Sequence, residues 1–145
     1  MVHAEKDIKI NQPIKDVFEF LADGLNNRKW RSTVAQISLR SGESGTPGAV
    51  YNQFLKGPMN GKIPADYKIT SVERNKSIRF SVVTGPVKPD GEFTVHEVSG
   101  GTKVHFGLSC ELHGPAKLLE HTVVKSLQAE VNCLTELKRI LEGVI

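Results

Sequence analysis

The chain has 145 residues, of which 39% are apolar and 24% are charged, and these values are typical of one soluble globular domain. A chain of this length buries enough surface to fold without disulfide or metal scaffolding. Its 19 Lys and Arg against 16 Asp and Glu leave a net charge of +3, spread along the chain with no nucleic-acid footprint. We therefore expect a single domain over residues 1–145 that does not bind nucleic acid.

The sequence shows no sign of secretion, membrane insertion or metal binding. Cys110 and Cys133 lack the spacing of redox or zinc sites, and the N-terminal MVHAEKDIKI lacks the apolar run of a signal peptide. No apolar stretch approaches the roughly 20 residues that cross a bilayer. The five histidines have no neighbouring residues that complete a ligand set. We expect a cytoplasmic protein with no cofactor, no metal and no stable membrane insertion.

The chain begins with a predicted strand and two short helices. Residues 2–10 alternate between apolar and polar, as in a half-buried strand. Asn11 is a candidate N-cap ahead of Pro13, which suits the first turn of a helix. Apolar residues then recur at helical spacing: Ile14, Val17, Phe18 and Leu21. A second helical turn is expected over 26–31, with the only tryptophan, Trp30.

Six strand-length runs separated by turn residues follow, which is typical of an antiparallel sheet. They are residues 34–40, 49–56, 62–73, 77–84, 91–98 and 102–113. Gly100-Gly101 between the last two runs predicts a hairpin. The glycine-rich segment 42–48 lacks a phosphate-binding pattern and is expected to be a flexible loop or lid.

The chain ends in a predicted long helix over residues 116–142. Its apolar residues recur in steps of three and four: Ala116, Leu119, Val123, Leu127, Val131, Leu134, Leu137 and Leu141. This continuous stripe predicts a helix laid along the sheet. The order of elements therefore predicts an α+β fold: seven antiparallel strands, two short helices after the first strand, and a long C-terminal helix.

The pattern resembles the polyketide cyclase/dehydrase branch of the superfamily that includes START lipid-transfer domains and the birch-pollen allergen. The resemblance lies in the opening strand running into Pro13-Ile14-Lys15-Asp16-Val17-Phe18-Glu19-Phe20-Leu21, in Trp30 and Gly48, in the 62–73 strand and in the long helix. It implies the helix-grip fold, in which a bent seven-stranded sheet wraps around the last helix and leaves a cavity for apolar or amphipathic molecules. With 6% aromatic residues, we expect this cavity to be partly unfilled.

Alternation and helical phase predict which side chains line the cavity. The predicted lining is Trp30, Tyr67, Ile69, Phe80, Phe93, Phe106, Leu108, Val123, Leu127, Glu130 and Leu134. Trp30 is either near the cavity mouth, as the resemblance implies, or a hydrophobic plug. Of Tyr51 and Phe54, which lie on opposite faces of one strand, only one can point inward.

Two carboxylates, Glu120 and Glu130, share the apolar face of the long helix. A carboxylate buried there needs a partner, water or a ligand, and burial raises its pKa toward the range used in acid–base chemistry. Each is therefore either an ordinary partly solvated helix residue or a polar anchor inside the cavity. With Tyr67, they are the candidate catalytic residues.

Three functions remain open. The first is binding of a hydrophobic, lipid-like or polyketide-like small molecule, which needs only the cavity. The second is a metal-independent cyclase or dehydratase that uses Glu130, Glu120 or Tyr67 to move protons. The third is an accessory role beside a partner enzyme, because the N-terminal half also resembles a group of accessory proteins of carbon monoxide dehydrogenase. A homodimer is also possible.

Overall fold

A computed structural model of the chain describes residues 1–143. Seven strands form an antiparallel sheet in the order β1-β8-β7-β6-β5-β3-β2, and a short eighth strand, β4, pairs with β3. The strands are β1 (Val2–Ile10), β2 (Val34–Ser41), β3 (Val50–Lys56), β4 (Lys62–Pro64), β5 (Tyr67–Glu73), β6 (Ser77–Val82), β7 (Asp90–Val98) and β8 (Gly101–Cys110). The predicted α+β fold with its seven-stranded sheet is confirmed.

The strand predicted over 62–73 is in fact two strands. Pro64 ends β4 because proline has no N–H to continue a ladder. Asp66 then leaves the ladder: its N–H donates to Thr84 Oγ1, and its carboxylate accepts the N–H of Gln53 at 2.9 Å. The chain re-enters the sheet as β5 at Tyr67.

The helices are α1 (Ile14–Ala22), α2 (Asn27–Trp30), α3 (Glu120–Asn132) and α4 (Leu134–Leu141), with short 3-10 helices η1 (Gly24–Asn26), η2 (Pro58–Asn60) and η3 (Gly114–Leu119). Pro13, and not Asn11, is the N-cap of α1, and the Asn11 N–H instead donates to the Glu142 carboxylate at 2.7 Å.

The single C-terminal helix predicted over 116–142 is wrong at its start and in its continuity. Gly114 has a φ of +57°, and the chain after it winds as the 3-10 helix η3, so α3 begins only at Glu120. A break at Cys133 separates α3 from α4. The apolar stripe becomes buried from Val123 onward, whereas Leu119 is 57% exposed.

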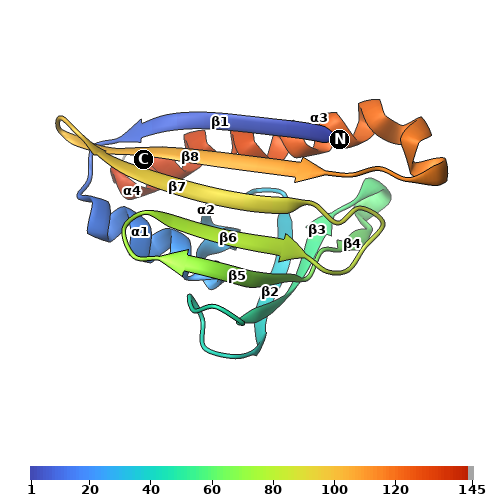
Figure 1. The fold of residues 1–145 in the computed structure, drawn as a ribbon, viewed down its shortest axis with the longest axis horizontal. Coiled ribbons are helices and arrows are strands. Elements are labelled where there is room, and N and C mark those ends of the chain that lie inside the picture. Colours follow the sequence, from blue (N-terminus) through green and yellow to red (C-terminus); the bar gives the residue numbers. More distant parts are fainter. Residues whose placement is uncertain (144–145) are drawn as a thin grey trace.

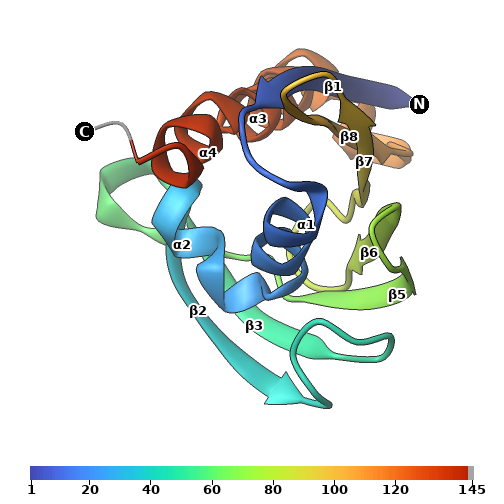
Figure 2. The same ribbon diagram turned by 90° about the vertical axis from the view of Figure 1, so that its left-hand side faces the viewer.

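The sheet curves around the short helices, and the C-terminal helices run along one edge (Figures 1 and 2). In Figure 1, α3 extends alongside β1 and β8. Figure 2 shows α1 within the curve of the sheet and α2 between α4 and β2. The concave side of the sheet therefore faces α1, α2 and α3, and the core lies there.

A row of aromatic side chains fills this concave side. Consecutive ring centroids along the row are 4.4 to 5.9 Å apart, in the order Tyr51, Tyr67, Phe80, Phe93 and Phe106. Trp30 meets Phe93 and Phe106 edge-on at 5.9 and 6.0 Å. Tyr51 is fully buried and Phe54 is half-buried, so Tyr51 is the inward residue of β3.

The row depends on a glycine in β7. Gly91 pairs with Phe80 across the sheet, and a Cβ at Gly91 would lie 2.2 Å from Cζ of the Phe80 ring. That ring is held between Tyr67 and Phe93 and has little room to shift. We predict that Gly91→Ala lowers the free energy of unfolding by about 1–3 kcal/mol, measured by urea denaturation.

The matched control is Gly107→Ala in β8. A Cβ there would meet the end of the His105 side chain at 3.3 Å and Glu92 Cγ at an ordinary contact distance of 3.9 Å. We expect a change within about 1 kcal/mol, because alanine also removes the entropic cost of glycine in a strand. Equal losses for the two variants would contradict the close approach of Phe80 to Gly91.

Candidate ligand-binding site

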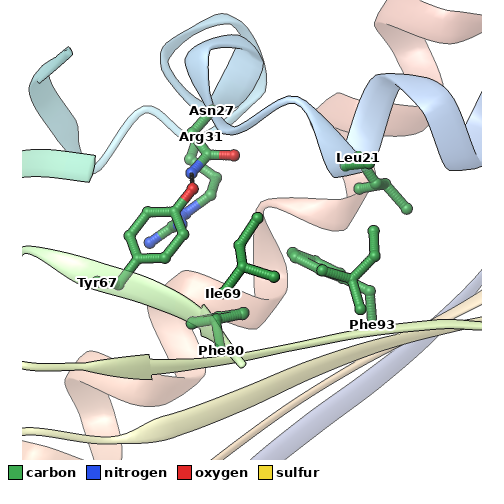
Figure 3. A pocket seen from close by; sticks show the side chains of 9 residues that line it. Leu21, Asn27, Arg31, Tyr67, Ile69, Phe80 and Phe93 are labelled. Carbon is green, nitrogen blue, oxygen red and sulfur yellow. Dashed lines mark hydrogen bonds between the residues drawn. The ribbon is translucent and has the colours of Figure 1, made fainter. Parts of the chain in front are cut away.

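A small interior cavity lies between α1, α2 and strands β5 to β7 (Figure 3). Its volume is about 10 Å³, close to the minimum that holds one water molecule. Its apolar lining is Leu21, Ala22, Ile69, Ile78, Phe80 and Phe93, and its polar lining is Asn27, Arg31 and Tyr67. The three polar residues lie together at one end in Figure 3, and Leu21 and Phe93 lie at the other.

Tyr67 and Asn27 form the first part of the polar end. The Tyr67 hydroxyl accepts a hydrogen bond from Asn27 Nδ2 at 2.9 Å, and both residues are about 95% buried. Burial raises the pKa of Tyr67 well above its ordinary value, because the phenolate would lose its hydration. The hydroxyl is therefore a neutral hydrogen-bonding group at the cavity wall.

Arg31 forms the second part, through an ion pair with Glu130. Its Nε and Nη2 donate to Glu130 Oε1 at 3.1 and 2.5 Å, and Thr33 Oγ1 donates to the same oxygen at 2.8 Å. Arg31 is 6% exposed and Glu130 is 8% exposed. Each buried charge thus has its partner, as burial requires. Arg31 lines the cavity, whereas Glu130 holds Arg31 in place.

Of the two alternatives open for each helix carboxylate, the structure places Glu130 in the interior and Glu120 at the surface. Glu120 is exposed in the first turn of α3, next to the exposed residues Leu119 and His121. Helical phase placed it on the stripe, but residues 114–119 wind as a 3-10 helix and the buried part of the stripe begins at Val123. Glu120 therefore has no access to the cavity.

All of the side chains predicted to line a cavity are buried, but only four reach the observed one. Those four are Tyr67, Ile69, Phe80 and Phe93. The others are part of the packed core: Trp30, Phe106, Leu108, Val123, Leu127, Glu130 and Leu134. Trp30, at 1% exposure, is a plug, and its indole N–H has no hydrogen-bond partner among residues 1–143.

The sequence predicts a partly unfilled cavity, but the cavity in the structure is much smaller than that prediction implies. Overall aromatic content does not reveal where the rings lie. Six of the nine aromatic side chains are on the concave face: the five rings of the row and Trp30, which contacts two of them. The rings take up the space that a larger cavity needs, and about 10 Å³ is left.

Asn27 and Arg31 are site residues that the sequence pattern did not predict. They are four residues apart on either side of Trp30, at the spacing that places side chains on one helix face. That spacing, next to the only tryptophan, is the signal that indicates a buried polar pair. Within residues 1–143, no three His, Cys, Asp or Glu side chains are grouped as metal ligands.

The site and fold define a helix-grip protein with an interior that is apolar at one end and polar at the other. The chain belongs to the family described as polyketide cyclase / dehydrase and lipid transport, which matches residues 1–142. Comparison with curated protein sequences gives no match. No helix within residues 1–143 is long and apolar enough to cross a bilayer.

Solved structures share the fold at low sequence identity. TTHA0849 from Thermus thermophilus is 19% identical with a TM-score of 0.79, and each chain is covered to 99%. A START superfamily protein from Mycobacterium smegmatis is 11% identical with a TM-score of 0.75, also at 99% coverage of each chain. Ara h 8.0201 is 15% identical with a TM-score of 0.75 and 97% coverage of each chain.

The ion pair leads to a stability prediction. Glu130→Gln leaves the Arg31 guanidinium buried without a charge partner, and we expect it to cost about 3–5 kcal/mol in urea unfolding. The control is Arg31→Met combined with Glu130→Leu, which removes both charges and fills similar volume. We expect the double variant to be clearly more stable than Glu130→Gln. A double variant as unstable as the single one would show that the charges do not act as a pair.

Tyr67 leads to a pH prediction. Because its pKa is raised in the native state, the unfolded chain loses this proton first, at about pH 10. The free energy of unfolding must then fall as pH rises above that value, by at most about 1.4 kcal/mol per pH unit. We expect Tyr67→Phe to remove this part of the alkaline slope, measured by urea unfolding between pH 9 and 11 (about one unit either side of the free value). Unchanged slopes would contradict the burial of an ionisable hydroxyl.

Proposed function

We propose that the protein binds one hydrophobic or amphipathic small molecule in its interior, between the sheet and helices α1 and α2. The observation that supports this most is the division of the cavity wall into an apolar part and a buried polar end made by Asn27, Arg31 and Tyr67. Pockets for small ligands are typically apolar with a few fixed polar groups. The family described as acting in lipid transport agrees with such a ligand.

The polar end favours a ligand with an oxygen-containing head. The Arg31 guanidinium, paired with Glu130, supplies N–H donors at the cavity wall, and the Asn27 amide and the neutral Tyr67 hydroxyl supply hydrogen bonds beside it. A carbonyl or carboxylate oxygen fits these groups, with the apolar part of the ligand toward Leu21 and Phe93.

Binding requires the interior to open, because about 10 Å³ is far below the roughly 300–1,000 Å³ of small-molecule pockets. The loop at residues 42–48 is the element we assign to this movement. Ser44 Oγ lies 2.7 Å from Asp23 Oδ1 and 2.6 Å from the Tyr51 hydroxyl, and the Gly45 N–H donates to that hydroxyl at 3.0 Å. These few bonds hold the loop against the start of η1 and against the aromatic row.

A cyclase or dehydratase is the second candidate, and Tyr67 is the observation in its favour. A neutral hydroxyl beside the Arg31 guanidinium is suited to polarise a substrate carbonyl. Acid–base chemistry of this type also needs a base, however. No carboxylate lines the cavity within residues 1–143, since Glu130 is bound to Arg31 and Thr33. The geometry therefore favours binding over catalysis.

Filling the cavity tests the proposal. We predict that Ile69→Phe, which places extra volume at the cavity wall, weakens binding of dodecanoic acid by at least about tenfold. The fluorescence of Trp30 is the reporter, because it is the only tryptophan and contacts Phe93 beside the cavity. Native mass spectrometry of the same samples gives the bound mass and the stoichiometry.

The matched control is Thr70→Phe. Thr70 is the next residue of β5 and is exposed on the opposite face of the sheet, so its substitution adds the same ring outside the cavity. We expect Thr70→Phe to bind as the unaltered protein does. Equal binding by all three proteins, or no binding by any of them, would exclude this interior as the site.

A further inference from the structure

Exposed apolar side chains occur at two chain connections at one end of the molecule. Among residues 2–143, the three most exposed large apolar side chains are Met59 at 99%, Leu118 at 88% and Leu119 at 57%. Met59 is in η2, between β3 and β4, and the two leucines are in η3, between β8 and α3. Figure 1 shows both connections at the same end of the long axis, and Figure 2, viewed from the other end, shows them on opposite sides of the molecule.

The β3–β4 connection holds Met59 outward in an unfavourable local structure. Met59 and Asn60 have φ values of +56° and +62°, in the left-handed region that asparagine tolerates and that methionine rarely adopts. Lys56 and Lys62 are directly opposite one another at the base of this turn, and like charges in that position repel. No carboxylate within residues 1–143 forms an ion pair with either lysine. Backbone strain of this kind clusters at functional sites.

The η3 connection, like the β3–β4 connection, has exposed apolar side chains, an exposed lysine and no acidic residue. Lys117 precedes Leu118 and Leu119, and all three are exposed. No acidic residue lies between positions 112 and 119, just as none lies between 54 and 65. The flanking acids are Glu111, whose carboxylate is 3.8 Å from the N-terminal amine, and Glu120. Both connections therefore combine protruding apolar side chains with exposed lysines.

We propose that this end of the molecule docks on an anionic lipid surface, with Met59, Leu118 and Leu119 in the interface and Lys56, Lys62 and Lys117 at the headgroups. Apolar side chains flanked by lysine are suited to the boundary between acyl chains and anionic headgroups. The apolar residues project from two separate connections at one end of the molecule, and a planar partner can contact both at once. The lysines would repel one another across an interface with a second copy, whereas anionic lipid neutralises them.

Sedimentation of the full chain with lipid vesicles tests the proposal. We expect binding to vesicles of phosphatidylcholine with phosphatidylserine, weaker binding to phosphatidylcholine alone, and a loss of binding as salt is raised. The variant Met59→Ser/Leu118→Ser/Leu119→Ser should bind at least about tenfold more weakly. Lys56→Glu/Lys62→Glu should lose the preference for phosphatidylserine.

The matched control is Leu25→Ser/Leu39→Ser, which removes two exposed apolar side chains outside these two connections. It should bind as the unaltered protein does. The proposal is overturned if the unaltered protein ignores both vesicles, if the triple variant binds normally, or if ultracentrifugation without lipid shows a dimer that the triple variant abolishes. Binding of dodecanoic acid by the triple variant is measured in parallel, so failure of docking and failure of the interior site are distinguished.

Discussion

The buried ion pair between Arg31 and Glu130 is the interaction on which the arrangement of the interior depends. Two charges inside a protein are tolerated only when each satisfies the other, so the end of α2 and the last turn of α3 must remain in contact. This contact fixes the orientation of α2. Asn27, one helical turn before Arg31, is then placed against the Tyr67 hydroxyl.

The curvature of the sheet sets the second constraint. A bent sheet has a concave side that must be filled or hydrated, and this chain fills it with rings from successive strands. Rings are large, flat and few in rotamers, so a short row covers the distance from Tyr51 to Phe106. The remaining void is small and lies where the row meets the polar groups of α2. The weakest part of the packing therefore coincides with the polar end of the interior.

Periodicity predicted the fold and much of the core, because alternation in a strand and steps of three and four in a helix are local properties. Phe80, Phe93 and Phe106 face inward as alternation requires. Periodicity gave wrong or incomplete predictions where the position of a side chain depends on contacts between distant parts of the chain. Glu120 has the right helical phase but lies before the buried part of the helix. The partner of Glu130 is 99 residues away in the chain, and no spacing rule relates the two positions.

The interior of this protein is closely packed, whereas apolar side chains are exposed at one end of the molecule. The aromatic row shields its own apolar surface when no ligand is present, so a ligand gains only the difference between its contacts and those of the rings it displaces. Such an exchange has a small net free energy, and occupancy then depends strongly on the local concentration of the ligand. A lipid surface concentrates apolar molecules. Contact with such a surface would therefore raise the ligand occupancy of a protein with this interior. The exposed side chains of η2 and η3 are suited to that contact. They lie outside the core, so the contact does not disturb core packing.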